Sequence, residues 1–140
     1  MKFAFVVAAL AALPATATLA QDGDAEAGKD LFKRCSSCHV IANGDEVIDG
    51  RGKTGPNLYG IAGRQAGTVE GFNYGDSLVA AGEAGLEWNE EDFAAYTADP
   101  RKFLQEYLDD SKARSKMSFR LRDGASDLWA YLVSVGPEAE

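Results

Sequence analysis

The chain has 140 residues, 46% of them hydrophobic, and its 22 acidic and 14 basic side chains give a formal net charge of −8. This acidic balance excludes non-specific nucleic-acid binding as the main function, because such binding needs a basic excess to neutralise phosphates. About 120 residues follow the N-terminal segment described next, which is enough for one domain with a modest core.

Residues 1–20, MKFAFVVAALAALPATATLA, have the layout of a secretory signal peptide. A lysine precedes an apolar stretch, and a run of small residues ends at Ala20. Polar sequence follows too soon for a convincing membrane-spanning helix. We predict cleavage after Ala20, with Ala17 as a second site, and a mature periplasmic domain of residues 21–140. An uncleaved membrane anchor is the alternative.

A first helix is predicted from Asp24, which can cap it, to about Cys38. The following segment, residues 43–85, holds eleven of the 15 glycines, which suits irregular loops with short helical turns. An irregular segment of this length is unusual in a compact domain unless it wraps around something.

Helical signals return in the second half of the chain. Asn89 caps one predicted helix, and Asp99, followed by a proline, starts another. Residues 109–122 are predicted to form a polar, basic loop, and a final helix is expected over Ala125–Val135. No segment alternates between apolar and polar residues as a strand would. The predicted fold class is therefore mostly α.

Both cysteines and the only histidine lie within five residues, as Cys35, Cys38 and His39. A redox dithiol expects a strand before the motif, and none is predicted. A structural zinc ion needs four ligands, and the chain offers three before a carboxylate. A disulfide would suit an exported protein but leaves the histidine unexplained.

Covalent haem attachment accounts for all three residues of the motif. Two thiols three residues apart can each add to one vinyl group of a porphyrin, and the next residue places an imidazole against the iron. A buried porphyrin would also supply apolar mass that a core interrupted by long loops lacks. The sequence therefore favours a covalently bound haem.

The second axial ligand cannot be another histidine, because His39 is the only histidine of the chain. Met117 is the only methionine after the predicted signal peptide, and its neighbours are too polar for a core position. We predict it as the sixth ligand, with Lys112 or Lys116 as a substitute at high pH. Ligation by His and Met leaves no open site on the iron and suits single-electron transfer.

The chain resembles class I c-type cytochromes, specifically the bacterial cytochrome c2 and c550 group. The resemblance rests on six blocks in order: GDAEAGKDLFKRCSSCH, KTGPNLYGIAGRQAGT, GFNYGDSL, LEWNEEDFAAYTADPRKFL, KMSF and DLWAYL. It implies a small single-domain fold, in which helices and glycine-rich loops wrap around one covalently bound haem c with its iron.

The resemblance also implies roles for single residues. Cys35 and Cys38 would be the thioether anchors, and His39 and Met117 the axial ligands. The Pro56 carbonyl would accept the ring N–H of His39. Further haem contacts are expected at Arg64, Tyr74 and Trp88, near the propionates, and at Tyr96 and Ser115, near the methionine sulfur. The crossing of the first and last helices is expected at Gly28, Phe32, Leu128 and Tyr131.

The implied function is that of a monomeric electron carrier without catalysis of its own. It would take electrons from a membrane cytochrome bc-type complex and pass them to an oxidase, a photosynthetic reaction centre or a periplasmic reductase. Basic side chains around Met117 are predicted to dock on acidic partners: Lys112, Arg114, Lys116 and Arg120. The alternative is a haem enzyme or gas-binding sensor, which needs an open or labile sixth position.

Overall fold

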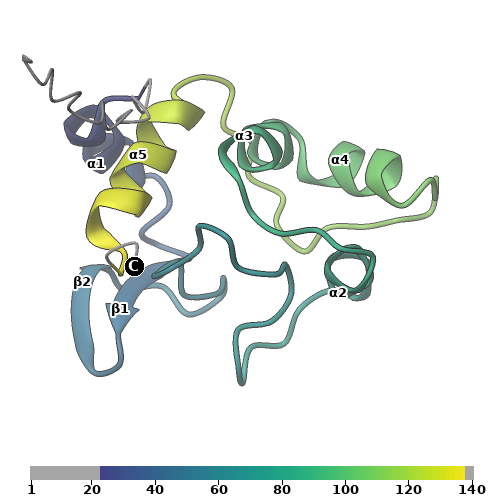
Figure 1. Cartoon of the computed structure of the whole chain (residues 1–140), viewed down its shortest axis with the longest axis horizontal. Coiled ribbons are helices and arrows are strands. Elements are labelled where there is room, and N and C mark those ends of the chain that lie inside the picture. The colour runs from purple at the N-terminus through teal and green to yellow at the C-terminus, as the bar shows by residue number, and fades with distance from the viewer. Residues whose placement is uncertain (1–22, 138–140) are drawn as a thin grey trace, which may run out of the picture.

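The computed structural model describes residues 23–137, and the predicted signal peptide, residues 1–20, lies outside them. The described residues form five helices and one two-stranded sheet, which confirms the mostly α fold class (Figure 1). The elements are α1 (Ala25–Phe32), β1 (Val40–Asn43), β2 (Glu46–Gly50), α2 (Asp76–Glu83), α3 (Glu90–Ala98), α4 (Pro100–Tyr107) and α5 (Ala125–Val135). None of these helices has the length and apolar character that crossing a membrane requires.

Helices α1 and α5 pack against each other, so the first and last helices of the described chain are in contact (Figure 1). Gly28 allows the close approach, because a Cβ there would overlap the backbone carbonyl of Asp127. Beside this point the rings of Phe32 and Tyr131 lie with their centroids 6.0 Å apart. The backbone N–H of Asp24 also donates to Asp127 Oδ1 at 2.8 Å. The helix crossing that the resemblance implies is present.

Helix α1 is shorter than predicted. It ends at Phe32, and residues 33–38 continue as hydrogen-bonded turns instead of extending the helix. The Cys35 N–H donates to the Phe32 carbonyl at 2.8 Å, and the Cys38 N–H donates to the Cys35 carbonyl at 3.1 Å. Bonds to the third preceding residue tighten the end of a helix. The CSSCH motif therefore lies on a compact turn at the end of α1.

Helices α3 and α4 begin at the predicted caps. Asn89 Oδ1 accepts the backbone N–H three residues later at 2.8 Å, and Asp99 Oδ1 does the same at 3.0 Å. Each bond satisfies an N–H that the helix itself leaves without a partner. Pro100 takes the first position of α4, where a missing N–H costs nothing. The last helix, α5, has the predicted bounds Ala125–Val135.

The prediction that the chain has no strand was wrong, because β1 and β2 form an antiparallel hairpin directly after the CSSCH motif. Gly44 in its turn has φ +59, a conformation that favours glycine. Strand β1 buries the neighbours Ile41 and Ala42, whereas β2 exposes the neighbours Val47 and Ile48. The alternation that identifies a strand in a sequence is therefore missing, and the register shifts between Ile41 and Ala42.

Helix α2 was not predicted as a separate element of the glycine-rich segment. Gly82 lies inside it, at a position where glycine costs roughly 1 kcal/mol relative to alanine. A Cβ at Gly82 would overlap the carbonyl of Ala66, so the glycine lets α2 pack closely on the preceding loop. Tertiary packing therefore outweighs the weak local preference for a helix here.

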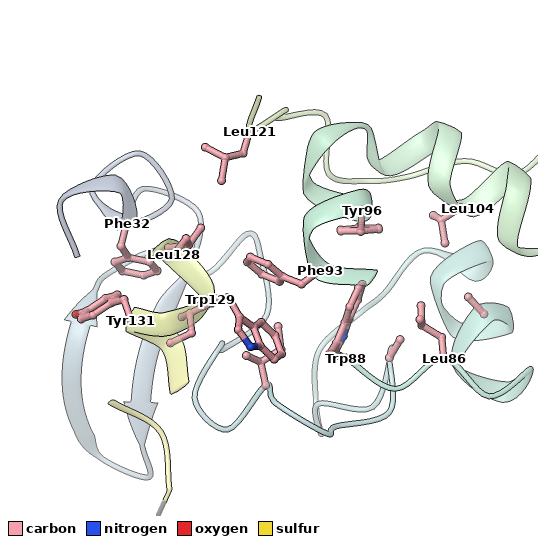
Figure 2. Packing of buried hydrophobic residues seen from close by; sticks show 14 of the residues in the cluster. Phe32, Leu86, Trp88, Phe93, Tyr96, Leu104, Leu121, Leu128, Trp129 and Tyr131 are labelled. Atoms are coloured by element: carbon pink, nitrogen blue, oxygen red, sulfur yellow. The ribbon is translucent and has the colours of Figure 1, made fainter. Parts of the chain in front are cut away.

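Buried aromatic rings connect the pair of helices α1 and α5 to α3 (Figure 2). Phe93 of α3 lies 5.2 Å from Trp129 of α5, measured between ring centroids. One turn further along α3, Tyr96 meets Trp88 edge-on, with their ring centroids 5.1 Å apart. Such pairs add to the burial of apolar area and favour one relative orientation. They fix α3 and the loop before it relative to α5.

We predict that Gly28→Ala lowers the midpoint of chemical denaturation. Helix propensity alone would stabilise α1 by roughly 0.5–1 kcal/mol. The new Cβ would overlap the Asp127 carbonyl, however, and forced overpacking typically costs about 1–3 kcal/mol. Lys29→Ala, at an exposed position on the same helix, is the control and should change the midpoint little. A midpoint raised by Gly28→Ala would contradict the close helix contact.

Candidate cofactor site

An apolar cavity of about 330 Å³ lies among the CSSCH turn, the glycine-rich loops, α3 and the loop before α5. This volume lies in the range of roughly 300–1,000 Å³ that is usual for ligand and cofactor pockets. All ten residues that the sequence analysis named as site residues line this one cavity: Cys35, Cys38, His39, Pro56, Arg64, Tyr74, Trp88, Tyr96, Ser115 and Met117. The fold therefore gathers residues from both halves of the chain around a common space.

The two cysteines lie at the cavity wall with free thiols. Burial raises the pKa of Cys35 to about 11. Cys38 is exposed, and hydrogen bonds with the Thr54 and Ser37 hydroxyls lower its pKa. Within residues 23–137, no three His, Cys, Asp or Glu side chains are grouped so that they could hold a metal ion. This arrangement disfavours the structural zinc site.

The imidazole of His39 is held by one backbone oxygen. Its Nδ1 lies 2.8 Å from the Pro56 carbonyl, which can only accept, so Nδ1 carries the hydrogen and Nε2 keeps a free lone pair. Burial lowers the pKa of His39, which favours the neutral ring. A Cβ on Gly55 would lie only 2.6 Å from Nδ1. Glycine at position 55 therefore lets the backbone approach the ring.

Asn57 was not singled out in the sequence analysis, although it lies in the TGPNL part of one resembling block. Its Oδ1 accepts the backbone N–H groups of Ala42, at 3.1 Å, and Tyr59, at 3.0 Å. Its Nδ2 donates to the Ala42 carbonyl at 2.7 Å. The side chain thus joins β1 to the loop that carries Pro56.

Arg64 uses part of its guanidinium within the same loop. Its two Nη atoms donate to the carbonyls of Asn57 and Tyr59, each at 3.0 Å, and burial lowers its pKa. A guanidinium has five N–H donors, so three more can serve another acceptor in the cavity. Tyr74, also at the cavity wall, accepts the Val69 N–H on its hydroxyl at 3.1 Å.

Met117 is held through its own backbone. The Ser115 hydroxyl donates to the Met117 carbonyl at 2.9 Å and accepts the Met117 N–H at 3.1 Å. The Tyr96 hydroxyl lies 3.4 Å from the Ser115 hydroxyl oxygen, and burial raises the pKa of Tyr96. This small network fixes the loop at the residue whose thioether lines the cavity.

The loop that carries Met117 is anchored to neighbouring elements on one side. The Arg114 N–H donates to Ser77 Oγ, and Lys116 Nζ donates to the Asn73 carbonyl, both at 3.0 Å. These bonds join the loop to α2 and to the segment before it. They leave the positive charges of both basic side chains without a carboxylate partner among the described residues.

Arg120 differs from the other basic residues predicted for docking. Its Nη2 forms a 3.0 Å ion pair with Asp99, the cap of α4, and this pairing offsets its charge. On the opposite side of the loop, the Arg34 guanidinium lies 5.2 Å from the centroid of the Phe119 ring. Arg34 and Phe119 also line the cavity.

The donor atoms suit a haem c better than the other candidates. Two thiols can form thioether bonds, while an imidazole nitrogen and a thioether sulfur are typical axial ligands of haem iron. The remaining wall is largely apolar, and Gly55 keeps the space beside the imidazole clear of a side chain. The residues present therefore fit this group.

Comparisons with known proteins agree with the fold and the cavity. The Cytochrome c family profile matches residues 25–136. Cytochrome c-551 of Roseobacter denitrificans is 59% identical over 116 residues, or 81% of this chain and 82% of that protein. Cytochrome c2 of Rhodobacter capsulatus is 49% identical over 137 residues, or 96% of this chain and 98% of that protein. The X-ray structure of cytochrome c2 from Rhodobacter sphaeroides has a TM-score of 0.80 and 48% identity, and the match covers 84% of this chain and 100% of that one.

Together with the fit of the cavity, these matches establish the family and its cofactor. The identities extend over most of the chain and of each relative, so the likeness is not limited to the CSSCH motif. The chain therefore belongs to the cytochrome c family, as a class I c-type cytochrome of the c2 and c550 group with one covalently bound haem c.

Proposed function

We propose that the protein is a single-electron carrier, with Cys35 and Cys38 as thioether anchors and His39 and Met117 as axial ligands. Haem c in this site supplies an iron that accepts and releases one electron. The observation that carries the proposal is the cavity itself, because both thiols, the imidazole and the thioether line one apolar space. No step of substrate chemistry is needed for this function.

His39 acts as an oriented, neutral ligand in this proposal. The hydrogen bond from Nδ1–H to the Pro56 carbonyl leaves Nε2 of this cavity-lining residue as the nitrogen that can bind iron, and it raises the basicity of that nitrogen. Burial keeps the ring neutral, which a nitrogen ligand requires. A backbone carbonyl is a suitable partner here because it can accept a hydrogen bond but cannot take the proton.

Met117 would supply the second ligand to the iron. Thioether sulfur favours ferrous iron and so raises the reduction potential. The apolar surroundings act in the same direction, since they disfavour the extra positive charge of the ferric state. With His39 and Met117 both holding the iron, a substrate or gas molecule would find no open site. The Ser115 bonds hold the methionine backbone in place.

We assign polar contacts at the cofactor's propionates to Arg64, Tyr74 and Trp88. The three further N–H donors of Arg64 can pair with a carboxylate, while its other two hold the loop. Tyr96 and Ser115 would lie near the methionine sulfur. All five residues line the cavity, which supports these assignments.

We also propose that residues 1–20 are removed as a signal peptide and that residues 21–140 act in the periplasm as a monomer. The donor would be a membrane cytochrome bc-type complex, and the acceptor an oxidase, a photosynthetic reaction centre or a periplasmic reductase.

Docking would depend on Lys112, Arg114 and Lys116, which are exposed around Met117. Arg120 contributes less than the sequence suggested, because Asp99 offsets its charge.

The first experiment is optical spectroscopy of the purified protein with and without carbon monoxide. The reduced wild type should give a haem c spectrum that carbon monoxide leaves unchanged, because Met117 occupies the sixth position. Met117→Ala should bind carbon monoxide rapidly, whereas Ser118→Ala, an exposed neighbour, should behave as the wild type. A wild type that binds carbon monoxide as fast as Met117→Ala would favour the enzyme or sensor alternative.

We predict that Gly55→Ala disturbs the ligation by His39. The added Cβ would overlap the imidazole, so the ring must move away from the Pro56 carbonyl. The oxidised spectrum should then show a partly high-spin iron. Gly63→Ala is the control, since a Cβ there has no atom within 4 Å. Gly63 has φ +75, whereas Gly55 has no positive φ, so the control carries backbone strain that Gly55→Ala lacks and still leaves the imidazole untouched. An unchanged spin state in Gly55→Ala would argue against His39 as the fifth ligand.

We predict that the second-order rate of electron transfer with a bc-type complex falls as ionic strength rises. Salt screens the attraction between the basic side chains and an acidic docking surface. At low salt, Lys112→Glu should slow the reaction by up to about tenfold. Lys29→Glu makes the same charge change on α1 and should have little effect. Equal effects of the two variants would show that net charge, and not a docking surface, controls the rate.

A further inference from the structure

We infer that Asn57 is a positioning residue for His39, an inference that rests on the proposed axial role of His39. Asn57 follows Pro56 directly, and the Pro56 carbonyl holds His39 Nδ1 at 2.8 Å. The Asn57 side chain makes three hydrogen bonds, all to backbone groups. It therefore lies one residue from the oxygen that orients the proposed ligand.

The amide of Asn57 pairs with β1 as a neighbouring strand would. It accepts the Ala42 N–H at 3.1 Å and donates to the Ala42 carbonyl at 2.7 Å, so both backbone groups of that residue are satisfied. Strand β1 starts at Val40, immediately after His39. The side chain thus fixes the chain that leaves the histidine relative to the chain that carries Pro56.

The same side chain also shapes the loop after Pro56. The Asn57 Oδ1 accepts the Tyr59 N–H at 3.0 Å. The backbone carbonyl of Asn57 accepts a hydrogen bond from Arg64, also at 3.0 Å. One backbone bond, from the Leu58 N–H to the Val40 carbonyl at 2.9 Å, joins β1 and the loop independently of the amide. Loss of the amide should therefore loosen the loop without releasing it.

The contacts of Asn57 bear on the position of the Pro56 carbonyl oxygen, which accepts the hydrogen bond from His39 Nδ1–H. If it moves away from Nδ1–H, the imidazole loses part of the hydrogen bond that raises its basicity. A less basic imidazole stabilises ferric iron less, so the ferrous state is favoured. We expect the midpoint potential to rise when Asn57 can no longer hold the loop.

The experiment compares Asn57→Ala and Asn57→Asp in the haem-loaded protein. The alanine variant loses all three side-chain bonds, whereas aspartate keeps the acceptor for two N–H groups and loses the donor to Ala42. The readouts are the midpoint potential and the exchange of the His39 Nδ1–H with solvent, followed by NMR in the reduced state. In Asn57→Ala the potential should rise and exchange should be roughly three- to tenfold faster. Smaller changes in the same direction are expected for Asn57→Asp.

Tyr131→Phe is the matched control for stability. It removes the 2.7 Å bond from the Tyr131 hydroxyl to Asp49 of β2, and so loosens the hairpin from α5 without touching the Pro56 loop. It should lower the denaturation midpoint and leave both readouts unchanged. If Asn57→Ala does not incorporate haem, Asn57→Asp and Asn57→Ser supply the comparison.

Two results are decisive, and they can be told apart. Asn57 variants that lose stability but keep the wild-type potential and Nδ1–H exchange would overturn the positioning role. The ferric wild type tests the axial role separately, through the strongly shifted NMR signals of an iron-bound imidazole. Their absence would overturn the proposed function itself. If these signals are present but the Asn57 variants keep the wild-type potential and exchange rate, this inference alone would be overturned.

Discussion

The hydrogen bond between His39 and the Pro56 carbonyl is the constraint on which the surrounding chain depends. It requires backbone to lie against an imidazole ring that comes from a different segment. Gly55 has no Cβ to block this approach, and its N–H donates to the Cys38 carbonyl at 2.8 Å. Gly52 likewise lies where a Cβ would overlap the backbone of Cys38. The glycines after the hairpin thus let one loop cover the CSSCH turn with backbone alone.

The buried polar atoms of the side chains near the cavity have partners within the protein. Arg64, Asn57 and Ser115 all bond backbone groups, and among the described residues no buried side-chain polar atom lacks a partner. Such bonds hold the loops in place without filling the apolar space. Arg64 brings one formal charge to the cavity wall, and the exposed basic residues around Met117 add more on the surface. The exposed charge suits a surface that meets partners.

The sequence predicted the parts of the fold that depend on local rules. The side chains of Asn89 and Asp99 cap helices in the structure, and α5 has the expected bounds. The hairpin was missed because a bulge and uneven burial remove its alternation. Helix α2 was missed because Gly82 suits a contact with Ala66 that only the folded chain reveals. Local patterns do not carry such long-range contacts.

For the site, too, local sequence predicted some features, and others depend on long-range contacts. The CSSCH motif predicts covalent haem attachment. Because histidine and methionine are scarce, the sequence leaves few candidates for the axial ligands. The resemblance supplied Pro56 and the remaining contacts, and the structure brings all of them to one cavity. The bonds of Arg64 to two carbonyls and the strand-like pairing of Asn57 could not be predicted. They depend on the path of the backbone after Pro56, which no local motif encodes.

The walls of the cavity differ in how firmly they are held. The loop around Met117 is joined to α2 and its preceding segment by hydrogen bonds and to Asp99 by an ion pair. Towards residues 33–39 no hydrogen bond or ion pair of the described chain crosses, and the contact of Arg34 with Phe119 spans the gap. An exposed pair of this kind contributes only about 0.5–1 kcal/mol, close to thermal energy. Every hydrogen bond and ion pair named above anchors the loop on its other side, so the side towards residues 33–39 is where the cavity wall is held least firmly.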